Sequence, residues 1–151
     1  MIERPAPTPR RQAADARRLA RYVWASPCTA IGLVAASALW ALGAQCRVRS
    51  GVVEVNFTAP LPGHASVLLK STFAALTLGH VVLARSQADQ DTLRQHERAH
   101  VAQYERWGPV FLLAYALSSL IQFLAGRRPY LDNHFEVQAR NACRAPPQRS
   151  N

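Results

Sequence analysis

Two long apolar runs dominate the pattern of hydrophobic and polar positions along the chain. Both residues 23–44 and residues 110–126 lack acidic and basic side chains. About 20 residues are enough to cross the hydrocarbon core of a bilayer, and a run of about 17 lies at the lower limit. The pattern therefore predicts a transmembrane helix over residues 23–44 and leaves the path of residues 110–126 to be decided by other evidence.

The flanks of the first run favour a signal anchor. Tyr22, Trp24 and Trp40 lie near its ends, where amphipathic rings prefer to sit. Six arginines precede the run within residues 1–22, which contain only two acidic residues, and two arginines follow just after it. This bias predicts a cytoplasmic N-terminus, with everything after residue 45 outside. A cleaved signal peptide, disfavoured by the long basic region, and a buried helix of a soluble domain are the alternatives.

The net charge of +9 raises the question of nucleic-acid binding. The arginines are concentrated in residues 1–22, and no basic motif studded with aromatic residues accompanies them. We therefore expect residues 1–22 to form a disordered cytoplasmic tail, with a short basic helix over residues 13–22 that lies on anionic headgroups. Membrane lipid is the expected partner, and nucleic acid is not.

Between the two runs the pattern changes from strand-like to helical. Residues 47–57 alternate with period two, which predicts a half-buried strand with apolar residues on one face and Glu54 and Asn56 on the other. The apolar positions are Val53, Val55 and Phe57. Residues 58–64 are predicted to be a loop, and residues 76–85 a second strand that contains His80 as an ordinary polar group. Residues 67–75 show no clear pattern.

A helix is predicted from Asp89 to Trp107, capped by Asp89 or Asp91 and stopped at Gly108-Pro109. It contains the motif H-E-x-x-H at residues 96–100. Residues four apart share one face of a helix, so the two motif histidines can bind the same ion, with the motif glutamate beside them.

A catalytic zinc site needs a third protein ligand, and the path of residues 110–126 decides whether one is available. A membrane crossing would place later residues about 25 Å from the motif. If the run instead folds back antiparallel on the preceding helix, residues 127–133 return to the level of His96. We expect this second path. Asp132 or Asn133 then caps a further helix, and Glu136 in its first turn completes a two-histidine, one-glutamate set.

The segments H-E-R-A-H-V-A-Q-Y-E-R-W-G-P and Y-L-D-N-H-F-E-V-Q-A-R resemble the gluzincin class of zinc metallopeptidases. In detail they look like small bacterial membrane-associated proteins with minimal zincin-like domains. The resemblance covers about residues 77–140 and departs at His134, where a proline is expected. It implies a bacterial inner-membrane protein that binds zinc through His96, His100 and Glu136, with Glu97 as general base.

Other side chains near the motif have alternative roles. His134 is a candidate ligand in place of Glu136, and His134 or Tyr130 a candidate oxyanion donor. Asp132 or Asn133 is a candidate support for a ligand histidine. Core packing is the simplest role of the aromatic residues on the two helices, Tyr104, Trp107, Phe111 and Tyr115. The three cysteines form no C-x-x-C pair, although a Cys46–Cys143 disulfide is permitted in an oxidising space.

The sequence thus predicts a mostly helical α+β fold. Its parts are a basic tail (1–22), a signal anchor (23–44), a zincin-like domain (47–142) and a disordered tail (143–151). The expected activity is zinc-dependent cleavage of a peptide or protein substrate. One alternative is a noncatalytic integral membrane protein with a structural, degenerate or absent metal site, and another is a basic surface-binding module.

Overall fold

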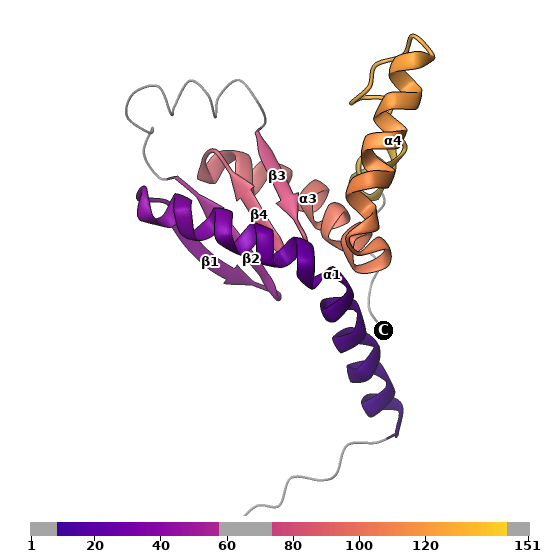
Figure 1. Ribbon diagram of the computed structural model, residues 1–151. Helices are drawn as coiled ribbons and strands as arrows, with labels where there is room; N and C mark the ends of the chain where they lie inside the picture. Colours follow the sequence, from indigo (N-terminus) through magenta and orange to yellow (C-terminus); the bar gives the residue numbers. More distant parts are fainter. Residues whose placement is uncertain (1–8, 58–73, 145–151) are drawn as a thin grey trace, which may run out of the picture.

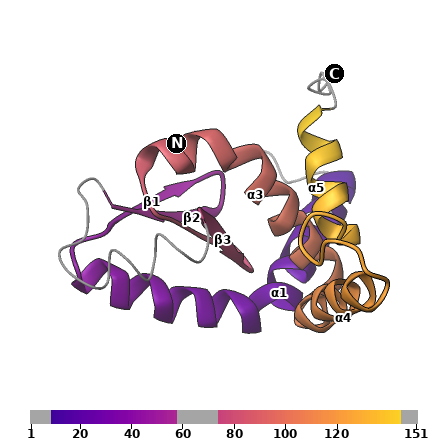
Figure 2. The same ribbon diagram turned by 90° about the horizontal axis from the view of Figure 1, so that it is seen from above.

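A four-stranded sheet lies between two long helices in the computed structural model, which describes residues 9–57 and 74–144 (Figure 1). The helices are α1 (Pro9–Ala41) and α3 (Gln87–Trp107), and Figure 2 shows them on opposite faces of the sheet. The shorter helices α4 (Val110–Leu124) and α5 (His134–Arg144) follow α3. The predicted mostly helical α+β class is therefore confirmed.

The sheet is built from two hairpins joined side by side. Its strand order is β1 (Gln45–Arg49), β2 (Val52–Asn56), β4 (Val81–Ala84), β3 (Ala75–Leu78). The pairs β1/β2 and β3/β4 are antiparallel, whereas β2 and β4 run parallel.

The prediction of single strands over residues 47–57 and 76–85 was wrong, because each segment contains a tight turn. Ser50 and Gly51 turn the first segment with φ angles of 50° and 77°, in the left-handed region that suits a two-residue hairpin. Gly79, with φ of 59°, and His80 turn the second. His80 thus lies in a turn and not within a strand.

Strand β2 is buried on both faces. Val53 and Val55 pack in a core cluster with Ala36 of α1, as the predicted alternation requires, and Val52 packs with Val101 of α3. The face with Glu54 and Asn56, expected to be exposed, is buried as well. The Glu54 carboxylate lies 3.3 Å from Arg94 and 3.1 Å from Arg98, both on α3. The half-buried prediction failed because these guanidinium groups compensate the buried charge.

Helix α1 begins at Pro9, within the segment predicted to be a disordered tail, and it packs directly on the sheet. Its buried positions are small: Ala25, Cys28, Gly32 and Ala36. A Cβ atom at Gly32 would lie 2.8 Å from the Leu78 carbonyl oxygen and from Val81 Cβ. Small side chains therefore allow the helix to approach the strands closely, and much of the predicted span forms part of the core.

Within the described residues, α1 is the one helix that is long and apolar enough to cross a membrane by itself. Membrane spans and signal sequences near an N-terminus share this composition. Many large apolar side chains on α1 face away from the sheet and are exposed, including Val23, Ile31, Val34 and Trp40.

Helix α3 starts two residues earlier than predicted and carries a different cap. Ser86 is the N-cap: its hydroxyl accepts a 3.1 Å hydrogen bond from the Asp89 backbone N–H and donates a 2.9 Å bond to the Asp89 carboxylate. The predicted cap residue Asp89 is thus a partner of the cap through both its backbone and its side chain, and Asp91 lies in the helix. The predicted stop is confirmed, because Gly108, with φ of 57°, is the C-cap.

The second apolar run leaves α3 at a bend of 115°, so it is not antiparallel to α3 as predicted. The chain nevertheless returns, because α5 packs against α3. Asn133 starts α5: its side-chain oxygen accepts a 2.9 Å hydrogen bond from the Phe135 backbone N–H. Phe135 then enters a core cluster with side chains of α1, α3 and α4: Ala25, Cys28, Tyr104 and Phe111.

Several predictions lie partly or wholly outside the described residues. These are the tail over residues 1–8, the loop over residues 58–64, most of residues 67–75 and the tail from residue 145 onward. The three cysteines are described, and all are free, so the permitted Cys46–Cys143 disulfide does not form.

Candidate metal centre

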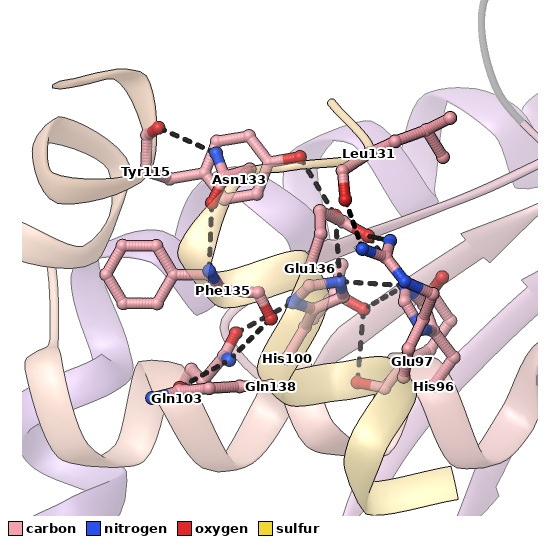
Figure 3. A network of polar contacts seen from close by, with 12 residues as sticks. His96, Glu97, His100, Gln103, Tyr115, Leu131, Asn133, Phe135, Glu136 and Gln138 are labelled. Atoms are coloured by element: carbon pink, nitrogen blue, oxygen red, sulfur yellow. Dashed lines mark hydrogen bonds and ion pairs between the residues drawn. The ribbon is translucent and has the colours of Figure 1, made fainter. Parts of the chain in front are cut away.

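Side chains from α3 and α5 meet at one point of the structure (Figure 3). His96 Nε2 lies 3.1 Å from His100 Nε2 and 3.1 Å from one carboxylate oxygen of Glu136, Oε2. The other oxygen, Oε1, lies 3.3 Å from His100 Nε2. The two histidines meet because they are one turn apart on α3, and Glu136 reaches them from the first turn of α5.

These three side chains fit a zinc ion. Ligands about 2.0–2.2 Å from a tetrahedral zinc lie about 3.3–3.6 Å from one another, so the observed separations need to widen by only a few tenths of an ångström. Glu136 Oε2 is buried, and it faces His96 Nε2 at 3.1 Å, so a metal ion held between them would contact both atoms. Two imidazoles and one carboxylate form a donor set that zinc accepts. His96, His100 and Glu136 can therefore hold a metal ion.

A glutamine on α3 sets the orientation of one histidine. Gln103 Oε1 lies 2.8 Å from His100 Nδ1, so Nδ1 donates its proton to Gln103, and Nε2 faces Glu136 and offers a lone pair to a metal ion once its own proton is displaced. The amide of Gln103 is itself fixed, because its Nε2 donates to the Phe135 carbonyl at 3.0 Å and to Gln138 Oε1 at 3.2 Å. His100 is thus held in the tautomer that a metal ligand needs.

Glu136 is ionised in the described structure although it is buried. Burial acts to raise its pKa, but hydrogen bonds from His100, His96 and Tyr115 outweigh this effect and hold the pKa well below the ordinary value of 4.5. The Tyr115 hydroxyl donates a 2.9 Å hydrogen bond to Glu136 Oε1. Arg140, one turn further along α5, adds a guanidinium nitrogen 3.8 Å from Oε2. The site therefore presents a carboxylate anion to a cation.

Asn133 positions α5, and with it Glu136, against α4. This asparagine is fully buried, and its side-chain nitrogen donates to the Tyr115 carbonyl at 3.0 Å and to Ser119 Oγ at 2.7 Å. The capping role foreseen for Asp132 or Asn133 therefore falls to Asn133. Asp132 instead forms an exposed ion pair with Arg128 at 2.9 Å.

Glu97 is buried beside the cluster but does not belong to it. Thr77 Oγ1, on strand β3, donates a 2.6 Å hydrogen bond to Glu97 Oε2. The hydroxyl fixes one carboxylate oxygen and holds the side chain against the sheet. This arrangement is suited to a base that must accept a proton from a defined direction.

Two other candidate residues lie at the margin of the site. Partial burial, the Glu136 carboxylate and a hydrogen bond to it raise the pKa of Tyr130 to about 12. Tyr130 thus lies close to the carboxylates with its hydroxyl protonated, and it is more than half exposed. His134 is exposed, and its Nε2 accepts a 2.9 Å hydrogen bond from Gln138. Among the described residues, His134 is not a member of the metal cluster.

His80 lies in a separate polar cluster that joins α1, α3 and the β3/β4 turn. Its ring stacks on Tyr22 with centroids 4.0 Å apart, and its Nε2 lies 3.3 Å from Glu105. The Thr29 hydroxyl lies 3.2 Å from Nδ1 and accepts a bond from the His80 backbone N–H. These contacts agree with the prediction of an ordinary, satisfied polar group.

Three residues that support the site were not predicted in that role from the sequence. Gln103 carries a usable signal, because it lies three positions after His100 and therefore on the same helix face. Tyr115 was expected in the core, and it lies there while its hydroxyl reaches Glu136. Thr77 carries no local signal, because its contact with Glu97 joins residues 20 positions apart.

Comparisons with protein-family models, curated proteins and solved structures found no match. The likeness to gluzincins therefore rests on the H-E-x-x-H helix and on the His96, His100 and Glu136 cluster that the fold assembles.

Proposed function

We propose that this protein is a membrane-associated zinc-dependent hydrolase, and specifically a metallopeptidase that cleaves a peptide or protein substrate. One observation carries the proposal: ligand atoms of His96, His100 and Glu136 all lie within 4.8 Å of one another, next to the buried Glu97. Two histidines and a glutamate leave the fourth position of a tetrahedral zinc open, which is the arrangement of a catalytic site.

Each residue in and around the cluster has a separate role in the proposed reaction. His96, His100 and Glu136 hold the ion, and Gln103 and Tyr115 orient two of these ligands. A bound zinc ion supplies Lewis acidity and lowers the pKa of a coordinated water to about 7. Glu97, fixed by Thr77, accepts a proton from the attacking water and passes it to the leaving amine.

The position of Thr77 supports an extended peptide as the substrate. In the described sheet, β3 pairs with β4 alone, so its other edge offers backbone donors and acceptors. Thr77 lies on β3 and contacts Glu97. A peptide added along β3 would therefore pass close to the general base.

Helix α1 provides the proposed attachment to the membrane. It is long and apolar enough for a span, and its exposed face is rich in large hydrophobic residues. Because the other face of α1 packs on the sheet through Gly32 and Ala36, we propose attachment through the exposed face, with the arginines that precede residue 22 at the anionic headgroups of a bacterial inner membrane. Membrane lipid is thus a proposed partner.

A peptide-hydrolysis assay on the full chain tests this function. The probe is a library of quenched fluorescent peptides, offered to wild-type protein and to E97Q, both loaded with zinc. We expect E97Q to keep its zinc and to lose at least about 100-fold of the hydrolytic rate. Equal rates would refute the role of Glu97. Zinc binding without hydrolysis in the wild type would support a noncatalytic metal site.

A further inference from the structure

Helix α4 has its polar side facing inward. Ser118 Oγ accepts a 3.0 Å hydrogen bond from the His134 backbone N–H, and Ser119 Oγ accepts one of 2.7 Å from Asn133. Tyr115, on the same side, donates to Glu136. These three polar residues thus contact the start of α5 and the metal centre.

The opposite side of α4 is a stripe of exposed leucines. Leu113, Leu117, Leu120 and Leu124 have exposed fractions of 73%, 58%, 51% and 75%. Their spacing of four, three and four residues places them on one helix face. We call these four residues the leucine stripe. In a helix of a soluble protein the apolar stripe faces the core, so α4 has the reverse arrangement.

The surroundings of the leucine stripe extend this apolar surface. Val110, Ile121 and Phe123 on α4 are also exposed. Helix α4 projects away from the sheet, on the side where α1 lies (Figures 1 and 2). Helix α1, which also carries exposed apolar residues, is thus on the same side of the sheet as α4. An apolar surface of this extent marks a site that is covered in the functional protein.

Charge and polarity favour lipid as the covering partner. Helix α4 carries no charged side chain, and Arg127 and Arg128 follow two residues after its end, with Arg128 paired to Asp132. Basic residues at the end of an apolar helix suit anionic headgroups. A protein interface ordinarily contains about one hydrogen bond per 100–200 Å², whereas the leucine stripe offers no hydrogen-bonding side chain. Leucines with this spacing can also pair two helices, but a second copy would supply no anionic group for Arg127, whereas lipid headgroups do.

The length and the two faces of α4 define its orientation in the bilayer. Its 15 residues make a helix about 22 Å long, which is too short to cross the hydrocarbon core of about 30 Å. Because its polar side contacts α5, the helix lies in the plane of one leaflet with only its leucine face in the lipid.

We infer that the leucine stripe of α4 is embedded in one leaflet, with Arg127 and Arg128 at the headgroups. This inference rests on the proposed membrane association but uses residues other than α1. It also deepens the proposed function, because Tyr115 of α4 touches the ligand Glu136. The metal centre then lies at the bilayer surface, and its substrates are peptide segments close to the membrane.

Site-specific labelling of the full chain in vesicles tests the inference. A background with C46S and C143S leaves only the buried Cys28, which a polar thiol reagent does not reach. An environment-sensitive fluorophore is attached at L117C or at L120C, and at D91C as the control on α3. The vesicles contain phosphatidylcholine and phosphatidylglycerol, with or without a lipid-borne nitroxide quencher.

We expect the quencher to reduce fluorescence at residues 117 and 120 several-fold and to leave residue 91 nearly unchanged. Labels on the leucine stripe that water-soluble iodide quenches as strongly as the label at residue 91 would overturn the inference. Energy transfer between stripe labels of two chains, without lipid quenching, would overturn it in favour of a dimer. Zinc content and peptide hydrolysis, measured on the same samples, report separately on the proposed function.

Discussion

Thr77 donates a 2.6 Å hydrogen bond to the carboxylate of Glu97, from strand β3 to helix α3. Both residues are buried, so this contact is shielded from water. The sheet thereby fixes the direction of the side chain that is proposed to accept the proton. Thr77 is a positioning residue in this account.

Replacing Thr77 by valine keeps the shape of the side chain and removes the hydroxyl. A hydrogen bond to a charged group is worth about 1.5–3 kcal/mol, so T77V should lower kcat by about 10- to 100-fold. Steady-state peptide hydrolysis measures the change. Zinc content should stay at the wild-type level, because Thr77 touches no metal ligand. T77S, which restores the hydroxyl, should recover most of the rate, and a rate in T77S as low as in T77V would argue for a packing role.

Gln103 should control metal affinity. In Q103L, His100 loses the acceptor for its Nδ1 proton, and the tautomer with a free Nε2 is no longer favoured. Loss of such a supporting contact typically lowers metal affinity by about 10- to 100-fold. Competition with a zinc chelator measures the affinity. The control is Q138A, which removes a partner of Gln103 but leaves the His100 contact in place, and equal losses in the two variants would contradict the prediction.

The close packing of α1 on the sheet predicts a strong effect at Gly32. A valine there would meet the Leu78 carbonyl oxygen and Val81, so G32V should lower the free energy of unfolding by about 1–3 kcal/mol. Thermal denaturation in detergent measures the effect. A30V, at an exposed position of the same helix, is the control and should change little. If α1 were detached from the domain, G32V and A30V would behave alike.

The response of stability to pH should differ between metal-free and zinc-loaded protein. Hydrogen bonds hold the pKa of Glu136 below 4.5 against the effect of burial, so its stabilising contribution is present above about pH 4.5 and is lost as the pH falls through the lowered pKa. Burial acts to lower the pKa of His100, but hydrogen bonds with Glu136 and Gln103 raise it above 6.5. That contribution is complete below about pH 6.5 and is lost as the pH rises through the raised pKa.

Together, these two groups therefore stabilise the folded state of the metal-free protein most between about pH 4.5 and pH 6.5. Zinc must displace the proton of His100, so its contribution grows as the pH rises. The increase in Tm on adding zinc should be larger at pH 8 than at pH 6. A zinc-induced increase that is the same at both values would contradict the assigned ligands.

Much of the metal centre could be predicted from the sequence, because the geometry of a helix depends on local spacing alone. His96 and His100 share a face through their spacing alone, and Gly108 ends their helix through its positive φ. The prediction of Glu136 as the third ligand also required that the second apolar run return the chain to α3. That return was predicted correctly, although the bend of 115° was not. The angle depends on how Phe111 and Phe135 pack with α1, which a single segment does not reveal.

Nonlocal contacts explain the features that were missed. Glu54 appeared to face solvent because the strand pattern alternates, and only the packing of α3 shows that Arg94 and Arg98 cover it. The turn at Ser50-Gly51 was not predicted, because the valines on both sides of it have the composition of a strand and suggest one continuous strand.

The central claim is that His96, His100 and Glu136 bind one zinc ion together. Zinc content by elemental analysis, with the coordination shell by X-ray absorption, tests it on purified full-length protein. We expect one zinc per chain in the wild type and in E97Q, with nitrogen and oxygen ligands at about 2.0–2.2 Å. H96A, H100A and E136A should each lose most of the metal. Full zinc occupancy with an unchanged ligand shell in E136A would contradict the account.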